Sequence, residues 1–163
     1  AKALNPIVYL DKDTLIGLSK QIFVVAGEEY NRSSDFFEEH IRNYEYDVAL
    51  DLALEALDYC DTALVNAPFT REVRDKEYMD NLRAKLAERD VELVVIWVDP
   101  EVCHQRMIER NSDRDTWKLE NWDKYISGCN FEKPDIPGLM VFKNSSTEEF
   151  NESIASMVKH FRG

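Results

Sequence analysis

Four short runs of apolar residues stand out from the polar positions around them: Ile7–Leu10, Ala63–Ala67, Leu93–Val98 and Leu139–Phe142. Each run is almost continuously apolar instead of alternating between apolar and polar positions. Strands that are buried on both faces have this pattern, as in a parallel sheet covered by helices. We therefore predict four buried strands of a mostly parallel sheet.

Between these runs the apolar residues recur at intervals of three and four, which is typical of amphipathic helices. The longest predicted helix is Asp35–Leu57, where Asp35 and Glu38 resemble a capping box. One face of that helix carries Phe37, Ile41, Tyr44 and Val48. Another helix is expected to begin at Thr14.

Three more helix starts follow from capping signals. Glu72–Arg89 comes after a Pro68–Phe69–Thr70 turn, and Asp99–Pro100–Glu101 combines a capping Asp, a first-turn Pro and an acid. Ser146 with Glu149 opens the last helix. Because strands alternate with helices, we predict an α/β protein, a three-layer α/β/α sandwich forming a single domain over residues 1–163.

Composition and charge narrow the functional classes. The chain has 163 residues and a formal charge of −12, which repels phosphate backbones and disfavours nucleic acid as the main partner. The three cysteines Cys60, Cys103 and Cys129 lack metal-ligand spacing, which indicates reduced thiols in a cytoplasmic protein. No apolar run approaches the ~20 residues that span a membrane. We expect no membrane partner, and the oligomeric state stays open.

Two carboxylates, Asp11 and Asp13, follow the first predicted strand. Ligands of open parallel sheets bind beyond the carboxyl ends of the strands. One acid could orient a magnesium-bound water while the other takes a proton from a substrate hydroxyl. The structural alternative is that Asp13 caps the helix starting at Thr14.

Asn66 ends the second predicted strand and precedes Pro68 and Phe69. P-loop proteins often place a metal-orienting acid at such a strand end, whereas an amide can orient water or substrate but cannot balance a cation. Asn66 and Phe69 are therefore substrate-site candidates. The alternative is a hydrogen-bonded strand end before a turn.

Four cations lie within thirteen residues of this acidic chain: Arg106, Arg110, Arg114 and Lys118. Asn111–Ser112–Asp113 is expected to interrupt their helix, so the cations would extend onto a loop. Arginine binds phosphate oxygens in a bidentate way and stabilises charge on a transferring phosphoryl group. The alternative is a solvated helix face paired with nearby acids such as Asp115. A last candidate, the Asn144 loop, either caps the final helix or contacts the edge of a base.

These motifs together resemble the small P-loop kinases related to gluconate kinase, chloramphenicol phosphotransferase, zeta toxins and polynucleotide kinase. Val94–Tyr125 resembles their strand–helix–lid–helix segment, with Asp99-Pro-Glu101 followed by R-x-x-x-R-x-x-x-R-D from Arg106. Leu10-Asp-Lys-Asp-Thr14, Val65-Asn-Ala-Pro-Phe69 and Asn144-Ser-Ser146 resemble further family motifs in the same order. The resemblance covers nearly the whole chain.

The resemblance implies roles for these residues. Asp13, or Asp11, would be the base that activates the acceptor hydroxyl, and Asn144 would lie near adenine. Lid cations within about 106–128 would contact phosphate: Arg106, Arg110, Arg114 and Lys118. Arg110 and Arg114 would also act in catalysis. The implied cofactors are ATP and Mg²⁺; the Mg²⁺ would have no direct protein ligand, although Asp11 could orient its water.

One family motif is missing from the 163 residues: no G-x-x-x-x-G-K-[ST] phosphate-binding loop occurs among the five glycines. In the family, the first strand, this loop and most of a helix precede the position of Ala1–Leu4, which itself resembles the last turn of a helix. We therefore expect a preceding unit on the order of 20 residues.

Three functions are compatible with the motifs. The first is an ATP-dependent kinase acting on the hydroxyl of a small molecule, with the acceptor and the choice of ATP or GTP left open. The second is a nucleotide-sensing or scaffold protein of the same fold without catalysis, which Asn66 and the missing loop favour. A weaker third is a nucleic-acid 5′-hydroxyl kinase, against which the charge of −12 counts.

Overall fold

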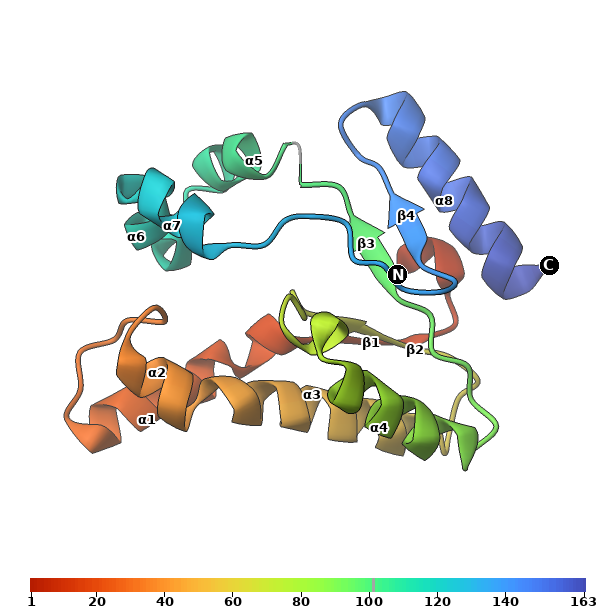
Figure 1. Cartoon of the computed structure of the whole chain (residues 1–163), viewed down its shortest axis with the longest axis horizontal. Helices are drawn as coiled ribbons and strands as arrows, with labels where there is room; N and C mark the ends of the chain where they lie inside the picture. The colour runs from red at the N-terminus through yellow and green to blue at the C-terminus, as the bar shows by residue number, and fades with distance from the viewer. Residues whose placement is uncertain (101) are drawn as a thin grey trace. The chain divides into compact units, whose positions relative to one another are not determined.

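The computed structural model describes residues 1–100 and 102–163, apart from the side chain of Arg114. These residues form two compact units, Ala1–Pro68 and Phe69–Gly163 (Figure 1). Each unit is mixed α/β and contains one pair of short parallel strands. The prediction of short parallel strands in a mixed α/β chain is confirmed, but the prediction that these strands are buried is wrong, because their residues are partly buried or exposed. The three-layer sandwich stays a prediction.

The first unit contains strands β1 and β2, three α-helices and two 3-10 turns. In chain order its elements are the 3-10 turn Lys2–Leu4, β1 Val8–Asp11, the 3-10 turn Lys12–Leu15, α1 Ile16–Ala26, α2 Asp35–His40, α3 Arg42–Ala56 and β2 Ala63–Asn66. The strands pair in parallel, with Val8 opposite Ala63 and Asp11 opposite Asn66. Helix α3 packs on both strands. The two carboxyl ends therefore lie side by side.

The core of this unit is aromatic. Phe23 of α1, Phe37 of α2 and Ile41 are buried together, and Tyr30 and Phe36 pack against them. The ring of Phe23 meets that of Tyr30 edge-on at 5.4 Å between centroids. The α1–α2 connection is therefore held by ring packing.

The predicted helix over Asp35–Leu57 is wrong in one respect: it breaks at Ile41, whose φ of −127° is not helical. The break shifts the buried face of α3. Tyr44 and Val48 are 68% and 42% exposed instead of buried, and the buried positions are Arg42, Glu45, Tyr46, Ala49 and Ala53. The cap is also one residue earlier than predicted, because the Ser34 hydroxyl accepts from the Phe37 N–H.

The second unit contains the other strand pair. Its elements are the 3-10 turn Glu72–Arg74, α4 Lys76–Ala87, β3 Ile96–Val98, α5 Cys103–Arg110, the 3-10 turn Asp113–Asp115, α6 Thr116–Glu120, α7 Trp122–Gly128, β4 Met140–Phe142 and α8 Thr147–Arg162. Strand β3 runs parallel to β4, and α8 packs against β4 (Figure 1). Helices α5, α6 and α7 follow one another in contact.

Of the helix starts predicted for this unit, one is confirmed and two are wrong. The Ser146 hydroxyl accepts from the Glu149 N–H and starts α8, as predicted. The predicted helix Glu72–Arg89 is divided, because Asp75 caps a new helix by accepting from the Tyr78 N–H. Asp99 does not cap α5, whose N-cap is Val102. Glu101, the expected first-turn acid, lies outside the described residues.

The predicted interruption after the arginine-bearing helix is confirmed. Helix α5 ends at Arg110, and Asn111 takes the left-handed conformation at φ 44°, which ends a helix. Within the described part of the chain, no helix is long and apolar enough to cross a membrane.

Candidate functional site

A polar cluster lies at the carboxyl ends of β1 and β2. The Asp11 Oδ2 atom accepts hydrogen bonds from the Tyr9 hydroxyl at 3.1 Å and from Asn66 Nδ2 at 3.2 Å. Its Oδ1 atom accepts from the backbone N–H of Asp13 at 3.0 Å. Asp11 therefore ties the two strand ends to the following turn.

The structure separates the roles of the two acids. The capping residue is Asp11, which starts the turn Lys12–Leu15, and not Asp13 as the structural alternative held. The Asp13 side chain stays 38% exposed, with its Oδ1 atom 3.6 Å from the Lys12 ammonium. Asp13 therefore presents a carboxylate to solvent from a turn whose backbone Asp11 holds.

Lys12 belongs to a buried ionic cluster beneath this turn, and sequence reasoning missed it. Its ammonium lies 2.9 Å from Glu45 Oε2, while Arg32 donates to both Glu45 oxygens at 2.7 Å. The Ser19 hydroxyl donates to Glu45 at 2.5 Å. Glu45 is only 4% exposed, so one carboxylate anchors α3 to the turn Lys12–Leu15, to α1 and to the 27–34 loop.

These contacts shift the titration of both buried groups. Burial alone would raise the pKa of Glu45, but hydrogen bonds from Arg32, Ser19 and Lys12 outweigh it and lower that pKa to about 2. Burial lowers the pKa of Lys12, and Glu45 opposes the shift. Lys12 therefore lies between two carboxylates, the buried Glu45 at 2.9 Å and the partly exposed Asp13 at 3.6 Å.

In the second unit, Arg106 and the Asn144 loop lie in contact, although the two were predicted separately, as a phosphate contact and a base contact. Arg106 Nη2 donates to the backbone carbonyl of Asn144 at 2.6 Å. The loop is held from α8, where the Ser153 hydroxyl accepts from the Lys143 N–H at 2.9 Å and donates to the Lys143 carbonyl at 3.1 Å. Among the described residues, the buried Asn144 Oδ1 atom has no hydrogen-bond partner.

Arg110 and Lys118 converge on an acid. The fully buried Asp115 accepts from Arg110 Nε at 2.9 Å and from its Nη2 at 2.6 Å. The Lys118 ammonium lies 3.9 Å from the other oxygen of Asp115. Arg110 therefore pairs with Asp115, as the solvated-face alternative expected, although Asp115 is buried and not solvated. The side chain of Arg114 lies outside the described residues.

The candidate residues thus form separate groups. Asp11, Asp13 and Asn66 belong to the first unit, whereas the lid cations and the Asn144 loop belong to the second. Phe69 is the first residue of the second unit and has a positive φ of 48°. Among residues 1–100 and 102–163, no group of three or more His, Cys, Asp or Glu side chains is arranged to hold a metal ion.

Comparison with known proteins adds no relative: no protein-family model, curated protein or solved structure matches this chain. The resemblance to small P-loop kinases therefore rests on the sequence motifs quoted above.

Proposed function

We propose that the chain is part of an ATP-dependent phosphotransferase that acts on the hydroxyl of a small molecule. The observation that carries this proposal is the polar cluster at the carboxyl ends of β1 and β2, where Asp11 positions the turn that bears Asp13. Parallel α/β sheets bind their ligands at this edge. A carboxylate exposed there is the group that a kinase needs beside an acceptor hydroxyl.

Asp13 is the proposed base and Asp11 is its positioning residue. Both oxygens of Asp11 already accept hydrogen bonds, from Tyr9, Asn66 and the Asp13 backbone. The Asp13 side chain is 38% exposed, so a hydroxyl can approach it. In the proposed step the acceptor oxygen bonds to the transferring phosphorus, the proton passes to Asp13, and the bond to the leaving diphosphate breaks.

The second unit carries the proposed ATP contacts. Arg106 donates to the backbone carbonyl of Asn144, so the proposed phosphate contact and the proposed base-contacting loop lie together. Arg110 and Lys118 are held together by Asp115, and the Arg110 side chain stays 44% exposed, so this pair of cations is the proposed phosphate contact. When bound, ATP with Mg²⁺ supplies the phosphoryl group.

The proposal requires a phosphate-binding loop, and none occurs in the 163 residues. The first measurement is therefore the intact mass and amino-terminal sequence of the natural protein. A natural protein without a G-x-x-x-x-G-K-[ST] segment would overturn the kinase proposal, because that loop holds the phosphates and the metal.

The catalytic test uses the natural protein with Mg²⁺-ATP and a panel of sugar acids, nucleosides and aminoglycoside-type antibiotics. Asp13→Asn should abolish phosphoryl transfer while leaving the ATP dissociation constant within a few-fold. The matched control is Asp47→Asn, an exposed acid on α3 that should leave transfer unchanged. If Asp13→Asn and the natural protein transfer phosphate at the same rate, Asp13 is not the base.

A second candidate is a nucleotide-binding protein of this fold without catalysis. The observation in its favour is Asn66: the amide occupies the strand end where an acid would balance a cation, and it donates to Asp11. This candidate predicts saturable ATP binding with no transfer to any acceptor. If Arg106→Ala loses ATP binding while keeping the fold, a nucleotide site at Arg106 is supported, whether the protein is a kinase or only binds nucleotide.

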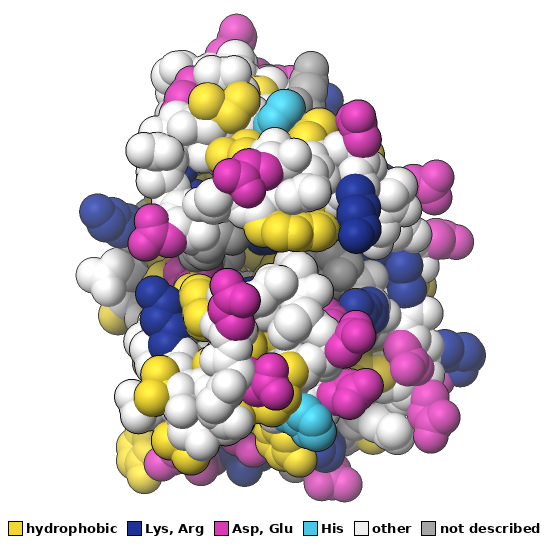
Figure 2. Space-filling view, turned by 90° about the vertical axis from the view of Figure 1, so that its left-hand side faces the viewer, with side chains coloured by type: hydrophobic (Ala, Val, Ile, Leu, Met, Phe, Trp, Pro, Cys, Tyr) yellow, Lys and Arg dark blue, Asp and Glu magenta, His cyan; other side chains and the backbone are white. Residues whose placement is uncertain are grey.

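The nucleic-acid 5′-hydroxyl kinase is the weakest candidate. On the face shown in Figure 2, acidic and basic side chains are interspersed, which does not favour a phosphate backbone. Oligonucleotide binding that falls steeply with salt would support this candidate, because bound cations are released from nucleic acid on association.

A further inference from the structure

The second unit contains a pocket of about 360 Å³ that none of the proposed kinase residues line. This volume lies near the lower end of the range of about 300 to 1,000 Å³ for ligand pockets. Its walls come from four places along the chain: the end of β3, the start of α5, helix α7 and the segment that follows α7. The side chains that matter most are Trp97, Cys103, His104, Trp122, Ile126 and Phe131.

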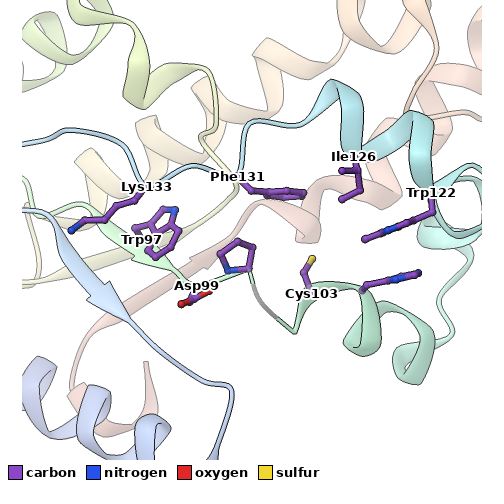
Figure 3. Close-up of a pocket in the computed structure, with 9 residues that line it drawn as sticks. Trp97, Asp99, Cys103, Trp122, Ile126, Phe131 and Lys133 are labelled. Atoms are coloured by element: carbon purple, nitrogen blue, oxygen red, sulfur yellow. The ribbon is translucent and has the colours of Figure 1, made fainter.

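The walls of this pocket are mainly aromatic and apolar. Figure 3 shows Phe131 and Ile126 on one side of the space and Cys103 on the opposite side, with Trp97 and Trp122 toward its two ends. His104 stacks on Trp122 with 3.6 Å between ring centroids and 8° between ring planes. A rigid aromatic wall therefore already exists at the Trp122 end.

Among the described residues, the charged groups that line the pocket are one acid and one base, Asp99 and Lys133. Both lie toward the Trp97 end of the pocket, Lys133 extending away past Trp97 and Asp99 on another side of that ring (Figure 3). Because their charges are opposite, these two side chains together do not favour an ion of either sign. Ring faces attract other rings at offset or edge-on geometries in addition to the gain from apolar burial.

We infer that this pocket binds a flat, uncharged aromatic molecule of one or two fused rings, with a ring lying between Phe131 and Cys103. The aromatic walls favour a ring over an aliphatic group of the same size, and the balanced charges favour a neutral one. The inference is independent of the proposed kinase activity, because the pocket uses neither Asp13 nor the lid cations. A failed test of one therefore leaves the other standing.

The alkylation rate of Cys103, which lines the pocket, can report whether the pocket is occupied. Burial raises the pKa of its thiol, while Lys118 and Arg110 oppose that shift, so alkylation should be slow and sensitive to what occupies the pocket. Cys60 is a matched control in the first unit with the same intermediate exposure. Mass spectrometry after timed N-ethylmaleimide treatment gives the alkylation rate of each cysteine.

The probe is indole, and the control is cyclohexanecarboxamide, which is neutral, non-aromatic and has the same number of heavy atoms. Indole should slow alkylation of Cys103 saturably, with a dissociation constant of roughly 0.1 to several millimolar as expected for a ligand of this size, and should leave Cys60 unchanged. Cyclohexanecarboxamide should bind about three- to tenfold more weakly, since a ring pair adds about 0.5–1.5 kcal/mol.

Two variants test the walls. Phe131→Leu keeps an apolar side chain but removes the ring, and should weaken indole binding about two- to tenfold. Its control is Phe150→Leu, because Phe150 packs on Phe142 and does not line the pocket. Ile126→Trp, which fills the space, should abolish protection and keeps the test decisive if Phe131→Leu does not fold.

Three results would overturn the inference. They are the absence of saturable protection at Cys103 up to the solubility limit of indole, equal protection by cyclohexanecarboxamide, and unchanged indole affinity in both Phe131→Leu and Ile126→Trp.

Discussion

Glu45→Gln is the substitution that tests the buried ionic cluster of the first unit. Gln keeps the shape of Glu45 but loses the charge that balances Lys12 and Arg32. Glu45 is 4% exposed and Lys12 5% exposed, so the buried ammonium would lose the carboxylate at 2.9 Å and be left with Asp13 at 3.6 Å. The carbonyl of Gln can still accept one hydrogen bond, whereas its NH₂ group would point at a cation.

The magnitude follows from the shifted titration of Glu45. Its pKa falls from 4.5 to about 2, and about 1.4 kcal/mol per unit gives roughly 3 kcal/mol of stabilisation at neutral pH. Removing one partner of a buried ion pair costs about 3–5 kcal/mol in other proteins. We therefore expect Glu45→Gln to lower the free energy of unfolding of the first unit by about 3 kcal/mol at pH 7.

The lowered pKa of Glu45 also determines how the free energy of unfolding changes with pH. Because the folded pKa lies below the unfolded one, the Glu45 contribution is complete above about pH 5 and is lost as the pH falls toward 2. The difference between the natural chain and Glu45→Gln should therefore shrink from about 3 kcal/mol at pH 7 to about 1 kcal/mol at pH 3.

The assay is urea unfolding with two probes. All three tryptophans lie in the second unit, so their fluorescence reports that unit, while far-UV circular dichroism also follows α1 and α3. Glu39→Gln is the control, because its side chain is 71% exposed and should change stability by less than about 0.5 kcal/mol. A Glu45→Gln effect below about 1 kcal/mol, or a difference independent of pH, would refute the reasoning.

Two further predictions use the same assay. Tyr46→Ala should lower the free energy of unfolding by about 3 kcal/mol, because Tyr46 is 6% exposed, whereas Tyr44→Ala should lower it by less than about 0.5 kcal/mol, because Tyr44 is 68% exposed. Equal effects of the two substitutions would contradict the helix break at Ile41. Ser34→Ala should lower the free energy of unfolding by about 1 kcal/mol, because the helix cap is lost, and the control Ser33→Ala should leave it nearly unchanged. If Ser34→Ala is as stable as the natural chain, the capping residue is Asp35, as the sequence predicted.

Some site geometry was predictable because it depends on the ends of strands. Asp11 and Asn66 each follow a continuous apolar run, and carboxyl ends of parallel strands lie together. The contact between Arg106 and the Asn144 loop, after strands that pair as β3 and β4, was not predicted. What the sequence did not indicate was which acid caps the turn, since Asp11 and Asp13 carry the same group two positions apart.

The sequence by itself determined the positions of the strands to within about three residues and the interruption at Asn111, because apolar runs and turn residues act locally. Only the tertiary structure decided the buried face of α3. The positions Phe37, Ile41, Tyr44 and Val48 fit one continuous helix, and nothing local reveals that Glu45 is buried.

Glu45 is buried because its partners Lys12 and Arg32 arrive from other segments of the chain, and a buried charge is stable only when such partners are present. The aromatic pocket has the same origin: Trp97, Trp122 and Phe131 are far apart along the chain, and only the path of the backbone brings them around one space. Contacts between distant residues depend on the whole fold, and local patterns do not encode them.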